Sequence, residues 1–433
     1  MEPAATRQQE AQADATFWDA RPSLAQIRDF ARACRCSPWA VLGVALARVV
    51  GVTPPFVMLP PLVGTNASLN LFVALVGPSG SGKGASEGAA ADALDLPDLH
   101  TATTGSGKGL PHLYAHRERT AGVVRDRDAV LITIPEVDTL TALGSRQGST
   151  LLSVLRSAWS GERLGFSNAD RQRTIPIEAH SYRLSLILGV QPARAGALLN
   201  DSDGGTPQRF LWLPVTDPLA PEVRPPAPPA RQLRRHVWTA NAHGRVVLTI
   251  PAVAERAIDR THLARTRGDG DALDGHALLC RLKAAQALTL LDDRQHMNDE
   301  DWQLAGYVMC VSRRTRDRVR RELAADEERR NRARGRADGI RALAAEDVVE
   351  ESSVVRVLRS VLRHLGKTGS MARSDVLKTS PAVTANNFPR PSGASSRPAR
   401  SSPSRPSTAS GSDSRGARRE VHEGVGNRGH VRG

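Results

Sequence analysis

The pattern of hydrophobic positions changes along the chain from helical spacing to continuous apolar runs. Between residues 21 and 51, apolar positions recur every three to four residues, which predicts a helix that begins near Pro22 and is divided at Pro38. A proline-rich bend follows at 54–61, and residues 69–76 are then apolar almost without interruption. Such a run is typical of a strand buried on both faces of a parallel sheet.

Further apolar runs lie at 129–134, 183–190 and 210–214, with segments of helical pattern between them. Strands that alternate with helices indicate an α/β fold with right-handed crossovers. We therefore predict an α/β core with a parallel sheet, flanked by helical regions on both sides in the sequence.

The pattern after residue 217 is mainly helical. Residues 218–231 are rich in proline and predict a stiff linker, and 245–250 resembles a short strand. Amphipathic spacing then predicts helices at 273–291 and 299–319, with another amphipathic segment at 354–365. The sheet is thus expected to be followed by a helical domain.

The composition and charge of the chain favour nucleic acid as a partner. Of 433 residues 40% are hydrophobic but only 4% aromatic, so the core must rest on Ala, Leu and Val. The formal charge of +14 favours binding to polyanions, nucleic acid first, although a GC-rich coding sequence also produces an excess of Arg, Ala and Gly. After Ser380 the chain is composed mainly of Ser, Pro, Arg and Gly, and we interpret it as a disordered basic tail.

Cysteine usage and hydropathy indicate a cytoplasmic protein. The four cysteines are too few and scattered for a disulfide framework, and Cys34 and Cys36 have no second Cys/His pair at zinc-ligand spacing. Residues 1–14 are polar and lack the plan of a signal peptide. The apolar stretch at 39–63 is interrupted by an arginine and four prolines, so we expect no membrane segment.

A glycine-rich loop directly follows the first apolar run and reads Gly77, Pro78, Ser79, Gly80, Ser81, Gly82, Lys83, Gly84 and Ala85. It fits the G-x-x-x-x-G-K pattern of a phosphate-binding loop, in which backbone N–H groups, a helix N-terminus and a lysine hold the nucleotide phosphates. Gly84 departs from the pattern, because Ser or Thr normally ligates Mg²⁺ there. Ser86 lies two residues further on. We predict ATP binding by this loop.

A second glycine-rich segment, Thr104 to Gly109, contains Lys108 but follows a poor strand candidate. A surface turn is the favoured interpretation, and contact with DNA or nucleotide is the alternative.

The apolar run at 129–134 ends in Pro135, Glu136, Val137 and Asp138. A nucleotide hydrolase needs one carboxylate to polarise the attacking water and another to hold Mg²⁺. We predict Glu136 as the catalytic base and Asp138 as the magnesium-associated carboxylate. A plain acidic loop at a strand end remains the structural alternative.

Two further polar positions are candidates for catalysis. Gln191 ends the run at 183–190, where a polar side chain can bridge the attacking water and the γ-phosphate. Arg209 stands between a glycine-rich turn and the run at 210–214, a position that suits an arginine finger acting on a neighbouring subunit. Arg194 is a lesser candidate, and a surface salt bridge is the alternative for Arg209.

Residues 163–177 form two extended runs around a polar tip and predict a β-hairpin. Arg171 and Arg173 lie near this tip and could contact the phosphate backbone of DNA. An exposed hairpin with ordinary surface charges is equally compatible with the pattern.

The order of these motifs resembles that of a family of uncharacterised P-loop ATPases from bacterial phages, plasmids and integrative elements. The resemblance also includes Phe17-Trp18, Gln191-Pro192 and the segment Gly205 to Phe210. Its members resemble the helicase half of primase–helicase proteins. The resemblance covers roughly residues 15–375 and implies a RecA/AAA+-like core, assembly into a homo-oligomeric ring, action on DNA, and priming by a separate primase.

The domain prediction that combines pattern and resemblance has six parts. They are an N-terminal helical region at 1–66, a P-loop ATPase core at 67–217, a linker at 218–235, a helical domain at 236–345, a partial winged-helix-like region at 346–379 and the basic tail at 380–433.

Three functions are open at this point. The preferred one is an ATP-hydrolysing motor or loader on DNA that uses Mg²⁺. A catalytically degenerate nucleotide-binding scaffold is the second, because Gly84 and Pro135 both depart from the hydrolase pattern. A small-molecule kinase is the third, which Gly84 alone permits.

Overall fold

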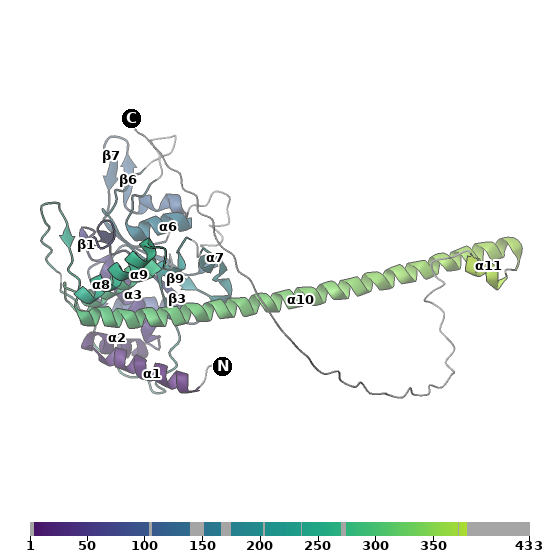
Figure 1. Cartoon of the computed structure of the whole chain (residues 1–433), viewed down its shortest axis with the longest axis horizontal. Coiled ribbons are helices and arrows are strands. Elements are labelled where there is room, and N and C mark those ends of the chain that lie inside the picture. Colours follow the sequence, from purple (N-terminus) through teal and green to yellow (C-terminus); the bar gives the residue numbers. More distant parts are fainter. Residues whose placement is uncertain are drawn as a thin grey trace, which may run out of the picture. The chain divides into compact units, whose positions relative to one another are not determined.

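The computed structural model describes residues 4–103, 106–138, 151–165, 175–201, 204–234, 236–269, 274–370 and 372–378. The chain divides into two units, Met1–Asp338 and Gly339–Gly433. The first unit holds the sheet and the helices that cover it (Figure 1).

A five-stranded parallel sheet organises the first unit. Its strands are β3 (Leu71–Val76), β5 (Thr101–Ala102), β8 (Ala129–Ile134), β9 (Arg183–Val190) and β10 (Phe210–Pro214). They lie in the order β10-β3-β9-β8-β5, and every neighbouring pair is parallel. The prediction of an α/β core with a parallel sheet is therefore confirmed, with four of the strands at the predicted apolar runs.

The strand order decides which loops meet. Because all five strands run in the same direction, their carboxyl ends lie at one edge of the sheet and their amino ends at the other. β9 lies between β3 and β8, so the segments that follow these three strands are neighbours. In open α/β sheets, ligands bind at the carboxyl edge.

Three helices precede the sheet in the chain: α1 (Ala4–Asp19), α2 (Pro22–Ala33) and α3 (Pro38–Gly51). α2 and α3 each begin with proline, whose fixed φ suits the first turn, and the predicted division at Pro38 is confirmed. α3 lies across the sheet. A Cβ at Gly43 would stand 2.4 Å from Leu213 of β10 and 2.8 Å from Val73 of β3, so any larger residue would displace these side chains.

Phe17 and Trp18 at the end of α1 are buried in an aromatic cluster. The Phe17 ring stacks on Trp39 of α3 with centroids 4.8 Å apart, and it lies 5.5 Å from Tyr307. Asp14 accepts hydrogen bonds from Tyr307 (2.6 Å) and from the indole of Trp39 (3.2 Å). The Phe-Trp pair therefore fastens the N-terminal helix to the body of the unit.

The first unit contains further helices, 3-10 turns and small sheets. The helices are α4 (Lys83–Ala93), α6 (Leu151–Ser160), α7 (Gly196–Leu199), α8 (Ala252–Thr266) and α9 (Asp274–Leu291), with 3-10 turns η1 (Gly107–Gly109), η2 (Pro111–Leu113), η4 (Pro192–Arg194) and η5 (Pro207–Arg209). The small sheets are β12-β1-β2 (Val246–Val247, Val57–Leu59, Ala67–Ser68), β11-β4 (Arg231–Gln232, Leu94–Asp95) and the hairpin β6-β7 (Ala115–Glu118, Gly122–Arg125).

The helix α10 (Asp299–Thr368) begins at the predicted position but continues far beyond residue 319. Its first part is packed, and the Ser312 hydroxyl accepts a hydrogen bond from the backbone N–H of Trp212 (2.8 Å), which satisfies a donor on the edge strand β10. In the second unit, residues 339–368 continue this helix with mostly exposed side chains, and α11 (Arg373–Lys378) follows. The described part of 346–379 is helical, and a winged-helix-like region stays a prediction.

None of the helices in the described part of the chain combines the length and the apolar character needed to cross a bilayer.

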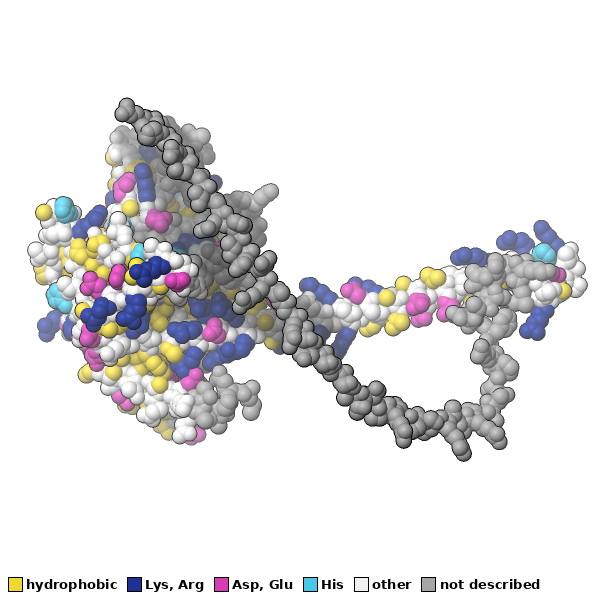
Figure 2. Space-filling view, in the orientation of Figure 1, with side chains coloured by type: hydrophobic (Ala, Val, Ile, Leu, Met, Phe, Trp, Pro, Cys, Tyr) yellow, Lys and Arg dark blue, Asp and Glu magenta, His cyan; other side chains and the backbone are white. Residues whose placement is uncertain are grey.

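On the face seen in Figure 2, arginine and lysine side chains are interspersed with acidic ones.

Candidate functional site

The loop Gly77–Gly82 connects β3 to α4 at the carboxyl edge of the sheet. Gly80 and Gly82 have φ values of +74° and +87°, in the left-handed region that favours glycine. Gly77 is required for another reason, because a Cβ there would stand 2.1 Å from Val215. The strand–loop–helix arrangement on which the phosphate-loop prediction depends is therefore present, with Pro78, Ser79 and Gly80 exposed.

Lys83 is the first residue of α4 and folds back over the loop. Its Nζ donates hydrogen bonds to the backbone oxygens of Gly77 (3.1 Å) and Pro78 (2.8 Å). Burial lowers the pKa of the Lys83 ammonium, and the carboxylate of Glu136 opposes this shift. The cation thus lies inside the loop, held by two of the loop's own carbonyl groups.

Glu136 and Gln191 meet beside this lysine. Glu136 follows β8, Gln191 follows β9, and the Gln191 Nε2 donates a hydrogen bond to the Glu136 Oε1 over 2.9 Å. Gly189 permits the close approach of the two strand ends, because a Cβ there would lie 1.9 Å from the Pro135 oxygen. The same Cβ would be 3.3 Å from Lys83, so segments following three neighbouring strands converge at one place.

Asp138, the predicted magnesium-associated residue, forms an ion pair with Arg194 at 3.3 Å; the Arg194 side chain is exposed and that of Asp138 is partly exposed. Arg194, the lesser arginine candidate, therefore lies at the carboxyl edge with the other site residues.

Gly84 occupies the position at which the predicted phosphate-loop pattern has a magnesium-binding Ser or Thr. Ser86 does not substitute for it: the side chain is buried, and its hydroxyl donates to the backbone oxygen of Gly82 (3.0 Å). A Cβ at Gly84 would meet no atom within 4 Å, so the space for a side chain is open. Among the described residues, no group of three His, Cys, Asp or Glu is placed to hold a metal ion.

Arg209 lies at the opposite, amino edge of the sheet, where η5 leads into β10. It is 8% exposed, its Nη1 donates to the Gly204 oxygen (2.7 Å), and its guanidinium lies 5.5 Å from the Trp159 ring centroid. Burial lowers the pKa of Arg209 to about 10. This arrangement does not present the guanidinium to a neighbouring subunit, and the arginine-finger prediction gains no support from it.

Both predicted DNA-contacting arginines, Arg171 and Arg173, lie outside the described residues. The base of their segment is described: Leu164 and Ile177 form an antiparallel bridge with backbone hydrogen bonds of 2.9 and 3.0 Å. Lys108 of the second glycine-rich segment is exposed in η1, beyond the short edge strand β5.

Sequence reasoning missed a cluster of buried cations at the amino edge. Arg183 and Lys283 are fully buried, and their charged groups donate to backbone carbonyls rather than to carboxylates. Lys283 lies on an amphipathic helix, where a lysine is normally solvated, and no local signal distinguishes it.

No protein-family model matches this chain, and no curated protein matches it either.

Proposed function

We propose that this chain is a P-loop ATPase with a RecA/AAA+-like core, and that it acts as a helicase-like motor or loader on the DNA of a mobile genetic element. The observation that carries the proposal is the convergence of Lys83, Glu136 and Gln191 at the carboxyl edge, directly beside a glycine loop at a helix N-terminus. This is the set of groups that phosphoryl transfer to water requires.

In this proposal each group has one task. The backbone N–H groups of Gly80 to Lys83 and the N-terminus of α4 hold the phosphates, and Lys83 exchanges its bonds to loop carbonyls for bonds to the β/γ oxygens. Glu136 accepts the proton of the attacking water once Gln191 turns its amide toward the γ-phosphate. The present 2.9 Å bond between Gln191 and Glu136 keeps both groups in place before the nucleotide arrives.

The residues present fit a magnesium ion that is carried mainly by the nucleotide and by water, a common arrangement for this ion. Asp138 would hold it, directly or through water, after release from Arg194, and the ion would supply charge neutralisation of the phosphates.

The DNA-dependent part of the proposal rests on the resemblance, the charge of +14 and the paired base of the 163–177 segment. A homo-oligomeric ring and a separate primase are expected from the resemblance. Arg194 is exposed and is therefore the better candidate for contact with the nucleotide of a neighbouring subunit, because Arg209 is buried.

One measurement separates the three functions: phosphate release from ATP by the full chain, with and without single-stranded DNA. A motor hydrolyses ATP and accelerates at least severalfold with DNA. A kinase transfers phosphate only when an acceptor is added, and a scaffold binds ATP without releasing phosphate. ATP hydrolysis that DNA does not change would leave the ATPase and remove the motor.

Two variants locate the DNA contact. Replacing Arg171 and Arg173 with Ala is expected to reduce DNA stimulation and spare basal hydrolysis. Deleting the residues after Ser380 removes nine arginines and three acidic residues, so it should weaken non-specific DNA binding and its salt dependence without changing stimulation. Loss of stimulation from the deletion alone would assign the DNA contact to the tail.

A further inference from the structure

A cavity of about 320 Å³ lies between α8, α9 and the segment 60–67. Its walls are mostly apolar, with Leu62, Ile258 and Leu279 contributed by the three elements. Residues 67–68 precede β3, so the cavity is at the amino edge of the sheet, about 20 Å along the strand from the glycine loop. It is therefore separate from the proposed nucleotide site.

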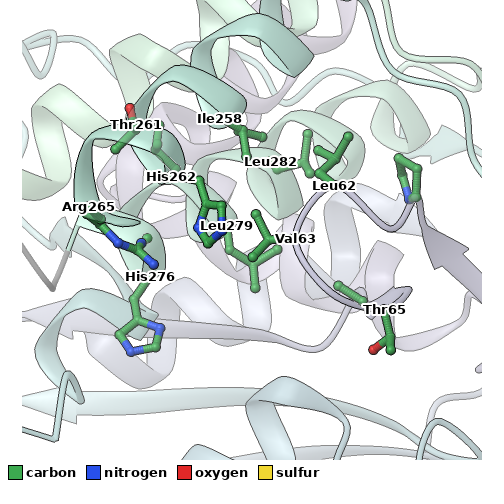
Figure 3. Close-up of a pocket in the computed structure, with 14 residues that line it drawn as sticks. Leu62, Val63, Thr65, Ile258, Thr261, His262, Arg265, His276, Leu279 and Leu282 are labelled. Atoms are coloured by element: carbon green, nitrogen blue, oxygen red, sulfur yellow. The ribbon is translucent and has the colours of Figure 1, made fainter. Parts of the chain in front are cut away.

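The cavity exists because α8 is well packed only in its first half. Ala254 and Ile258 are buried, whereas His262 and Arg265, on the same face further along, are only partly buried. Figure 3 shows Arg265 extending from α8 toward the start of α9, with His262 between it and Leu279. Gly275 of α9 makes room for the guanidinium, since a Cβ there would lie 1.8 Å from the Arg265 Nη1.

Two polar groups of the pocket wall have no partner among the residues that the structure describes. Across the described part of the chain, no hydrogen bond or ion pair reaches the Arg265 guanidinium. The Nδ1 atom of His262 is buried and has no hydrogen-bond partner either. Buried polar atoms in proteins are normally satisfied, so the unpaired His262 Nδ1 indicates a missing partner in the pocket. The partly exposed guanidinium of Arg265 lies beside the same mostly apolar cavity and can supply the charge that attracts this partner.

The electrostatic surroundings favour an anion. His276, which also lines the pocket, is half-buried, and this burial lowers its pKa to about 4; the charges of Arg209 and Arg265 add to the shift. The imidazole is thus neutral at pH 7, and within the described ranges of the chain no ion pair involves Arg209 or Arg265. A negative group placed here gains attraction without displacing an existing carboxylate.

We propose that this pocket binds a small organic anion with an apolar body, whose carboxylate, sulfonate or phosphate group pairs with Arg265. The apolar body would lie among the side chains of α8, α9 and the 60–67 segment, and His262 would complete the polar contact. The volume is within the range of small-molecule sites, in which apolar walls carry a few convergent polar groups.

The test is a fluorescence titration of the full chain with 1-anilinonaphthalene-8-sulfonate, an aromatic sulfonate that becomes bright in apolar sites. We expect one saturable site per chain, and Arg265→Gln is expected to weaken binding by about tenfold or more, since a charge-assisted contact is lost. The matched control is Arg260→Gln, which removes an exposed arginine of the same helix that does not line the pocket. It should leave the affinity unchanged.

Two further arms make the result decisive. N-phenyl-1-naphthylamine, which has the same body without the sulfonate, should bind more weakly and ignore Arg265→Gln. Leu279→Trp should fill the cavity and abolish binding, with circular dichroism as the check on folding. If that variant does not fold, Val63→Trp on the exposed rim replaces it.

Equal affinity of Arg265→Gln and Arg260→Gln for the sulfonate would overturn the proposal, as would equally tight binding of the uncharged probe or failure of both filling variants to reduce binding. Saturating ATP should not compete with the probe. Competition would place the probe in the nucleotide site and also overturn the assignment, whereas a chain that binds no ATP leaves this test intact.

Discussion

The two edges of the central sheet use cations in opposite ways. At the carboxyl edge, Lys83 is partly exposed and bonded to two carbonyls of its own loop, beside the exposed carboxylate of Glu136. At the amino edge, Arg183 and Lys283 are fully buried, and each joins segments that are distant in sequence. In the proposed function, the first set of bonds is exchanged for bonds to a nucleotide, whereas the second set holds distant segments of the fold together.

The amino edge shows how a buried cation is tolerated without a carboxylate. Arg183 donates to the backbone oxygens of Pro54 (2.7 Å) and Val57 (2.8 Å), while Lys283 donates to those of Asn70 (2.9 Å) and Trp159 (2.6 Å). These carbonyls belong to irregular segments, to the first residue of β1 and to the last turn of α6, so backbone oxygens take the place of a carboxylate as partners of the two cations. Burial lowers the pKa of Arg183 to about 9.

The difference between the two edges is tested most directly by replacing one lysine at each edge. Lys83→Ala is expected to abolish hydrolysis or to reduce it by more than about 10²-fold, because the main point charge on the β/γ phosphates is lost. Its thermal unfolding should be nearly unchanged. Phosphate release and circular dichroism check both parts, and normal hydrolysis by the variant would remove the phosphate-loop assignment.

Glu136→Gln keeps the shape of the side chain and loses its basicity. We expect ATP binding to persist and turnover to fall by about 10²-fold. Asp138→Asn is the matched variant at the same edge and should act mainly through the magnesium dependence of the reaction. An inactive Asp138→Asn beside a normal Glu136→Gln would reverse the two roles.

Lys283→Met should behave in the opposite way to Lys83→Ala. It leaves two buried carbonyls without a donor, so the free energy of unfolding should fall by about 2–4 kcal/mol, while ATP binding at 25 °C is retained. Denaturant unfolding measures the loss, with Lys367→Met on the exposed part of α10 as the control. An equally stable Lys283→Met would show that the buried cation is dispensable.

The amino edge should also make the fold sensitive to acid through His276. Its pKa is about 4 in the folded chain and about 6.5 when unfolded, so the unfolded state binds the additional proton first. The contribution of His276 to the free energy of unfolding is therefore present above pH 6.5 and is lost as the pH falls toward 4. This loss is about 1–2 kcal/mol after allowance for solvent screening. His276→Gln should show a smaller loss over this range, and an identical pH profile would contradict the assignment.

The smallest effect is expected at Gly84, where the carboxyl edge lacks a magnesium-binding hydroxyl but has room for one. Gly84→Thr should lower the Mg²⁺ concentration needed for half-maximal hydrolysis by a few-fold. Gly84→Val, of the same shape without the hydroxyl, is the control. Equal behaviour of the two variants would mean that this position does not face the ion.

The apolar runs were sufficient to predict β3, β8, β9 and β10, because a strand covered on both faces must be apolar at consecutive positions. They did not predict β5, since Thr101 and Ala102 form too short a run, and this strand is defined only by its pairing with Leu131 and Ile132. The helix starts at Pro22 and Pro38 were likewise predicted from the sequence, because proline restricts the backbone locally.

The features that the sequence by itself determined are local. They are the strands and helices with a strong hydrophobic pattern, and a loop in which Gly80 and Gly82 adopt the left-handed backbone conformation that glycine favours. The tertiary structure decided which strand ends are neighbours, and so brought Gln191 to Glu136 and left Arg209 at the opposite edge. It also decided that Lys283 is buried, and it created the cavity beside Arg265. These outcomes depend on strand order and on the packing of helices distant in sequence, and no local pattern of residues encodes either of them.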